Sequence, residues 1–118
     1  MRKVPVFRTL YEVDGVDMKR VFPTKQRQVR DIHDEFKTDD RVSSIMVFGS
    51  AVSDRCHQGS DIDILVRLRE DCVDVKNKNE ISEKIQNICD WNADVLWYDR
   101  IEKSDRIYGK ILEGVRIV

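Results

Sequence analysis

The chain has 118 residues, of which 41% are hydrophobic, so it is long enough to build the core of one domain and leaves room for little else. Its 21 basic and 22 acidic side chains give a net charge of -1, which gives no reason to expect a general affinity for nucleic acid or for an anionic membrane surface. The sequence shows neither a signal peptide nor a transmembrane segment, and we expect a single cytoplasmic domain over residues 1–118.

The first 22 residues are expected to form a β-hairpin. Residues 6–13 and 16–22 are rich in strand-forming side chains and flank Asp14-Gly15. An Asp-Gly pair between two such runs is typical of a tight hairpin turn. We therefore expect residues 1–22 to be an N-terminal extension of a core that spans residues 24–118.

Residues 24–37 are predicted to form the first helix. Val29, Ile32, His33 and Phe36 recur at the spacing of one helical face, while the intervening positions are mostly charged. His33 is interpreted as a packed histidine rather than a metal ligand, because no second ligand lies at helical spacing from it.

Two strands are predicted next, at residues 41–48 and 61–69. The first ends in a continuous apolar run, which is typical of a strand that is covered on both faces. In the second, alternation places Asp61 and Asp63 on one face and a core set on the other face, namely Ile62, Ile64, Val66 and Leu68.

The remaining chain is predicted to add two helices and two strands. A polar loop at residues 70–79, with Asn77 and Glu80 spaced as a capping box, precedes a helix that runs to about Trp91. A strand follows at residues 92–98. Ser104 is expected to cap the last helix, Gly114 to end it, and residues 115–118 to add a terminal strand. This alternation of helices and strands predicts an α/β domain.

Chemistry is expected where the first of these strands ends. Gly49-Ser50 follows that strand, and such a pair lets a backbone approach phosphate oxygens closely. Asp61 and Asp63 share a strand face with Cα atoms roughly 6 to 7 Å apart, a spacing at which a divalent cation would relieve their repulsion. Asp94 begins another, otherwise apolar strand. Each feature alone is weak evidence, because Gly-Ser turns and solvated aspartates are common.

In combination, these residues resemble the nucleotidyltransferase superfamily that includes DNA polymerase β, and most closely its minimal nucleotidyltransferase branch. The resemblance runs from about residue 24 to residue 118 and leaves only the N-terminal extension outside it. It implies a polymerase β-like fold, in which a mixed, mostly antiparallel sheet has its helices packed largely on one face.

The resemblance also implies residue roles. Asp61, Asp63 and Asp94 would bind two Mg²⁺ ions, and Asp94 would help to remove the proton of the acceptor hydroxyl. Gly49 and Ser50 would hold the triphosphate of ATP or of another nucleoside triphosphate.

Two further residues are expected at the phosphates. Members of this branch often carry an Arg within a few residues of the Gly-Ser pair, and here the first Arg is Arg55. Arg55 is expected to take that role, the alternative being a solvated turn residue. Ser60 is expected to orient the turn before Asp61, with direct phosphate binding left open.

The implied activity is transfer of a nucleoside monophosphate, most simply AMP from ATP, to a hydroxyl acceptor. In this branch, such small proteins are often antitoxins that silence a helical HEPN-type toxin by adding AMP to a tyrosine. The expected partner is therefore such a protein or a second copy of this chain. The alternatives are a small-molecule nucleotidyltransferase and a non-catalytic module that binds a nucleotide or a partner.

Overall fold

A four-stranded sheet with strand order β3-β2-β1-β4 organises the computed structural model, which describes residues 4–56 and 59–118. The central strand β1 (Val42–Phe48) pairs antiparallel with β2 (Ile62–Leu68) and with β4 (Val115–Arg116). The outer strand β3 (Ala93–Trp97) runs parallel to β2. The expected α/β class with a mixed, mostly antiparallel sheet is confirmed.

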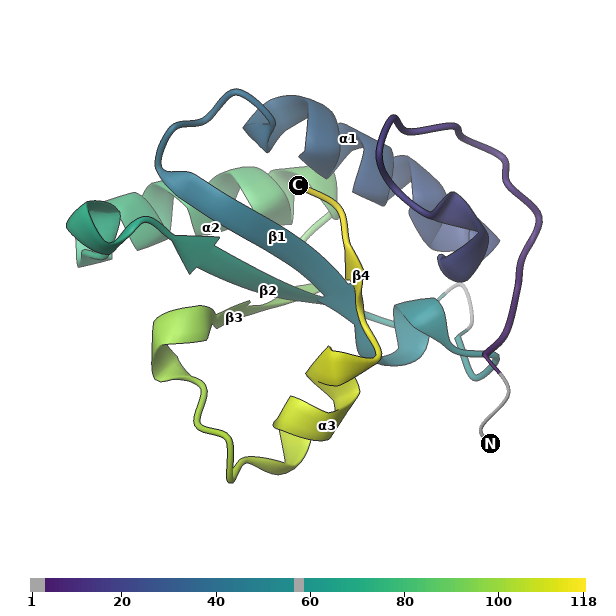
Figure 1. Cartoon of the computed structure of the whole chain (residues 1–118). Helices are drawn as coiled ribbons and strands as arrows, with labels where there is room; N and C mark the ends of the chain where they lie inside the picture. The colour runs from purple at the N-terminus through teal and green to yellow at the C-terminus, as the bar shows by residue number, and fades with distance from the viewer. Residues whose placement is uncertain (1–3, 57–58) are drawn as a thin grey trace.

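The sheet is covered on both faces, with two helices on one side and one on the other (Figure 1). α1 (Gln26–Phe36) and α2 (Val75–Ile88) contribute Ile32, Phe36, Ile81 and Ile85 to the main core. α3 (Arg106–Leu112) packs on the opposite face, in a smaller cluster of Phe48, Leu65 and Ile111. This second cluster explains why the apolar run at the end of β1 is continuous, because its side chains are buried in both directions.

Two helix starts differ from the sequence prediction. α2 begins at Val75, because the carboxylate of Asp74 accepts the Asn77 backbone N–H at 2.7 Å and caps the helix. The predicted loop therefore ends earlier, and the Asn77–Glu80 capping box is wrong: both side chains accept hydrogen bonds from Arg41 instead, at 3.1 and 2.6 Å. At α3 the N-cap residue is Asp105 rather than Ser104.

Gly114 ends the last helix as expected, and its lack of a side chain has a packing reason. Its N–H donates to the Ile111 carbonyl at 2.9 Å. A Cβ on Gly114 would lie 2.8 Å from the Val47 carbonyl oxygen, which is closer than real Cβ contacts. Glycine therefore lets the chain turn from α3 directly into β4 against the central strand.

The predicted N-terminal hairpin is wrong. Residues 4–17 have no strand, and between residue 4 and α1 the only regular pieces are the 3-10 turns Met18–Arg20 and Pro23–Lys25. Asp14-Gly15 does form a turn, with Gly15 at φ +76°, but one hydrogen bond between the two arms, from the Phe7 N–H to the Lys19 carbonyl, does not make a ladder.

A buried glutamine takes the hydrogen bonds that a hairpin would have used. The Gln26 side chain is fully buried at the start of α1. Its Oε1 accepts the backbone N–H groups of Leu10 and Tyr11, at 2.7 and 3.2 Å. Its Nε2 lies within hydrogen-bond distance of three carbonyls, those of Arg8, Met18 and Val21. Backbone groups that find a side-chain partner do not need a strand partner, so the local Asp-Gly signal does not decide the structure.

Three smaller findings concern single residues and membrane spans. His33 is a packed histidine, with Nδ1 2.6 Å from the Ile117 carbonyl oxygen. Within the described part of the chain, Cys56, Cys72 and Cys89 form no disulfide bond. Over residues 4–56 and 59–118, no helix has the length and hydrophobicity that crossing a bilayer requires.

Replacing Gln26 with Ala is expected to destabilise the domain by about 2–4 kcal/mol, because buried backbone groups lose their partners. Chemical denaturation of the purified variant would measure this change. The matched control is Asn79→Ala, which removes an exposed amide from α2 and should change stability by less than about 0.5 kcal/mol. Equal stability of the two variants would contradict the stabilising role of the Gln26 hydrogen bonds.

Candidate functional site

The turn after β1 places the Gly49-Ser50 backbone directly against Asp63. Gly49 has φ of +69°, in the left-handed region that favours glycine. A Cβ at this position would overlap the Asp63 carboxylate. The Ser50 N–H makes a backbone hydrogen bond to that carboxylate, and the Ser50 hydroxyl lies 3.5 Å from the Asp61 carbonyl oxygen. The predicted turn is therefore present, and glycine is required for its close approach to Asp63.

β2 and β3 bring two of the predicted carboxylates side by side. Asp63 and Asp94 are partners in the parallel register of these strands. Asp63 is also the partner of Phe48, the residue just before the Gly-Ser turn. Asp63 is half-buried, whereas Asp94 and Asp61 are exposed. Asp63 thus lies at the centre of the site, with an exposed carboxylate on the neighbouring strand.

The position of Asp94 is fixed from α2 through a second glutamine. Gln86 Nε2 donates to the Ala93 carbonyl at 2.7 Å, and Gln86 Oε1 accepts the Ala93 N–H at 3.2 Å. The Ile62 N–H donates to the Asn92 carbonyl at 3.0 Å and holds the start of β3 against β2. These bonds set the register at the residue just before Asp94.

The other two aspartates act electrostatically on Asp63. Burial raises the pKa of Asp63, and the negative charges of Asp94 and, more weakly, of Asp61 raise it further. The positive charge of Lys110 and the Ser50 backbone hydrogen bond act in the opposite direction and lower the pKa. Clustered carboxylates of this kind are common at functional sites.

This donor set fits a divalent cation such as Mg²⁺. Carboxylate oxygens are its preferred ligands, and the repulsion at Asp63 is what a bound cation would relieve. Within residues 4–56 and 59–118, however, no three His, Cys, Asp or Glu side chains are arranged so that together they could hold a metal ion. Binding by all three carboxylates therefore requires a rotamer change, which the exposed side chains of Asp61 and Asp94 allow.

An open pocket of about 660 Å³ lies beside the Gly-Ser turn. Arg55 lines it together with Gly49 and Ser50, so three of the four predicted phosphate-binding residues lie at one cavity. The Arg55 side chain is exposed, and its backbone N–H donates to the Ser53 hydroxyl at 3.1 Å. Asp61, Asp63 and Asp94 are not among the lining residues.

Ser60, the fourth predicted phosphate-binding residue, lies away from this pocket. Its carbonyl accepts a hydrogen bond from the ammonium group of the buried Lys25. Its side chain is hydrogen-bonded to Cys56, whose thiol pKa is raised by burial. These contacts hold the loop just before Asp61, in keeping with an orienting role for Ser60.

The structure adds two cationic residues that the sequence did not single out. Lys110 of α3 lines the pocket and interacts electrostatically with Asp63. Arg20, from the N-terminal segment, lines the same pocket. In the sequence, each is one of many charged residues in a polar stretch, and only the tertiary structure brings them to the Gly-Ser turn.

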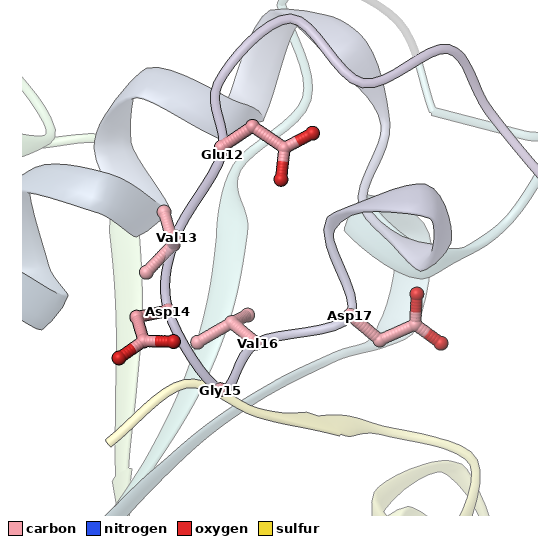
Figure 2. Close-up of a pocket in the computed structure, with 6 residues that line it drawn as sticks. All are labelled: Glu12, Val13, Asp14, Gly15, Val16 and Asp17. Carbon is pink, nitrogen blue, oxygen red and sulfur yellow. The ribbon is translucent and has the colours of Figure 1, made fainter.

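A second hollow, of about 530 Å³, lies in the N-terminal loop (Figure 2). It is lined by six consecutive residues, from Glu12 to Asp17, and by none of the predicted site residues. The three acidic side chains in this loop are therefore separate from the site at the Gly-Ser turn.

The fold is similar to that of solved toxin–antitoxin complexes. One is a tri-AMPylated Shewanella oneidensis HEPN toxin in complex with MNT antitoxin; the match has a TM-score of 0.57 and 20% identity and covers 80% of this chain and 71% of that chain. A toxin–antitoxin structure with AMP-PNP matches with a TM-score of 0.54 and 19% identity over 77% and 70% of the two chains. A mutant of the MntA–HpeT toxin–antitoxin matches with a TM-score of 0.50 and 19% identity over 70% and 64%.

No curated protein matches the chain. The sequence does match the profile of the family described as polymerase beta, nucleotidyltransferase, over residues 30–118. That range contains both strands of the aspartate pair and the Gly-Ser turn, and it begins after the N-terminal segment. The expected polymerase β-like fold is thereby confirmed, and the chain belongs to the polymerase beta nucleotidyltransferase family.

Proposed function

We propose that this domain transfers AMP from ATP to a hydroxyl acceptor in a Mg²⁺-dependent reaction. The observation that carries the proposal is the position of Asp63, which lies under the Gly49-Ser50 turn and beside Asp94 on the adjacent strand. Phosphoryl transfer needs placement and charge neutralisation rather than covalent chemistry. This arrangement brings hydrogen-bond donors for phosphate oxygens next to carboxylate ligands for a metal ion. The AMP-PNP complex of a protein with a similar fold supports an adenine nucleotide as the donor.

In the proposed reaction, the acceptor oxygen forms a bond to the α-phosphorus of ATP. The bond from that phosphorus to the α–β bridging oxygen breaks, and pyrophosphate leaves with the electron pair. Asp94, exposed at the rim, accepts the hydroxyl proton. The Gly49 backbone N–H and the Ser50 hydroxyl bind the phosphates of the leaving group, because the Ser50 N–H already donates to the Asp63 carboxylate. Bound by the aspartates, Mg²⁺ would neutralise phosphate charge and make the acceptor hydroxyl more acidic.

For the acceptor, we propose a tyrosine of a HEPN-type helical protein, with this chain as the antitoxin of the pair. The support is the similar fold of an MNT antitoxin solved with a tri-AMPylated HEPN toxin. Incubation with MgCl₂, ATP labelled at the α-phosphate and the product of the adjacent gene should label a tyrosine of that protein. Label appearing only on a small hydroxyl compound would instead show a small-molecule transferase. If no acceptor is labelled, this chain included, the domain is a non-catalytic module that binds a nucleotide or a partner.

Replacing Asp63 with Asn is expected to lower transfer by at least about 100-fold, because one metal ligand loses its charge. The same change should raise the melting temperature of the metal-free protein at pH 7. The pKa of Asp63 is raised in the folded state, so its ionisation opposes folding at any pH above that pKa. The labelling assay measures transfer, and thermal denaturation with and without MgCl₂ measures the melting temperature. Mg²⁺ should raise the melting temperature of the wild type more than that of the variant.

The control for this variant is Asp40→Asn, which alters an exposed carboxylate in the loop before β1. It should leave transfer and the Mg²⁺ response unchanged. Full activity of the Asp63 variant would show that the site has been assigned to the wrong carboxylate.

Replacing Gly49 with Ala is expected to destabilise the domain and to lower transfer at least 10-fold. The backbone conformation costs about 1–2 kcal/mol for a residue with a Cβ, and the new methyl group displaces the Asp63 carboxylate. Gly109→Ala is the matched control: the added Cβ on α3 meets nothing within 4 Å, so this change should be neutral or stabilise by about 0.5–1 kcal/mol. Equal behaviour of the two variants in denaturation and labelling would contradict the close-approach role of Gly49.

A further inference from the structure

The pocket beside the Gly-Ser turn is formed by three parts of the chain that lie far apart in sequence. The turn itself supplies one side, the end of α3 supplies a second with Lys110, and the N-terminal segment supplies a third with Val4, Pro5 and Arg20. The family match begins at residue 30, so the third side lies outside the part of the chain that the family profile describes.

The N-terminal segment is bonded to both of the other sides. The Phe22 N–H donates to the carbonyl of Ala51, in the turn, at 2.7 Å. The Arg20 guanidinium donates to the carbonyl of Glu113, at the end of α3, at 2.8 Å. Behind these contacts, the buried Gln26 amide holds the rest of the segment. The segment is therefore a fixed wall of the pocket.

The Arg20 guanidinium is only partly compensated by its surroundings. Its Nε atom is buried and has no hydrogen-bond partner among the described residues, and its contact with Glu113 is to a backbone carbonyl, not to a carboxylate. A cation with an unsatisfied buried donor is costly unless an anion lies nearby. An anionic group in the pocket would lower that cost.

Lys110 and Arg55 add two more positive charges to the same pocket. Both are exposed, and in the described part of the chain neither forms an ion pair within 4 Å. Lys110 lines the pocket, and its positive charge also acts on the Asp63 carboxylate. Among the described residues, the lining carries three cations against the two carboxylates of Asp54 and Glu113.

We propose that Arg20 and Lys110, together with Arg55, bind the β- and γ-phosphates of the nucleotide donor, and that residues 4–22 form a wall of the donor pocket. This inference rests on the proposed function, because it assigns ligands to the phosphates of the same donor. Four residues separate Arg55 from the Gly-Ser pair, and the two other cations reach the turn from distant segments instead. Charge-assisted bonds from these groups would stabilise the pyrophosphate as it leaves.

The test is calorimetric titration of the full chain with three probes in MgCl₂: α,β-methylene ATP, inorganic pyrophosphate and AMP. Lys110→Ala and Arg20→Gln should each weaken binding of the ATP analogue and of pyrophosphate roughly 10- to 100-fold. Binding of AMP, which lacks the β- and γ-phosphates, should change less than about 2-fold. Lys103→Ala is the matched control, since Lys103 is exposed in the loop before α3 and does not line the pocket.

Unchanged pyrophosphate affinity in Lys110→Ala, or an equal loss for AMP and pyrophosphate, would overturn the inference. If Arg20→Gln unfolds, Lys110→Ala still decides the matter, and Arg20→Lys should restore part of the affinity. Failure of the proposed function is seen separately. If the wild-type chain binds pyrophosphate through Lys110 but transfers no label, the phosphate site is supported and the proposed transfer activity is contradicted. If the Lys110→Ala variant transfers label as well as the wild type, the transfer activity is supported and the phosphate site is contradicted.

Discussion

The half-buried Asp63 carboxylate lies beside a second carboxylate, that of Asp94, at the centre of this domain. Asp63 is paired in register with Asp94 on one side and with Phe48 on the other, so three strands meet at its position. Burying a charge beside another of the same sign opposes folding. The Ser50 N–H and Lys110 offset part of that cost, and the two apolar clusters above and below the sheet hold the strands in place. Binding at this site depends on the closeness of Asp63 and Asp94, which the pairing of β2 with β3 imposes.

Much of the fold follows from periodicity, since the apolar stripes of the helices and the alternation in β2 are local signals that packing reinforces. The N-terminal segment does not, because Gln26 looks like one more polar residue at a helix start and its burial depends on tertiary structure. The turn, the aspartate pair and Arg55 can be found from motif and spacing. Lys110 and Arg20 cannot, since nothing local separates them from solvated cations, and only the chain path carries them to the pocket.

The two sides of the site differ in character. Gly49 and Ser50 follow the central strand and face a pocket with fixed walls, whereas Asp94 belongs to the outermost strand and is exposed. A donor bound at the turn would therefore contact three segments of this chain, while Asp94 stays accessible to solvent.

The Gln86 amide has a further consequence for how such a site tolerates change. β2 and β3 are parallel strands joined through α2, and the amide ties both backbone groups of Ala93 to that helix. Side chains alternate along a strand, so a slip of one residue would put Ala93 or Val95 beside Asp63 and turn the Asp94 carboxylate to the opposite face. Insertions in the loops at either end of α2 are thus tolerable only while the Gln86 side chain keeps its two hydrogen bonds to Ala93 in β3. The chemistry depends on a count of residues as much as on their identity.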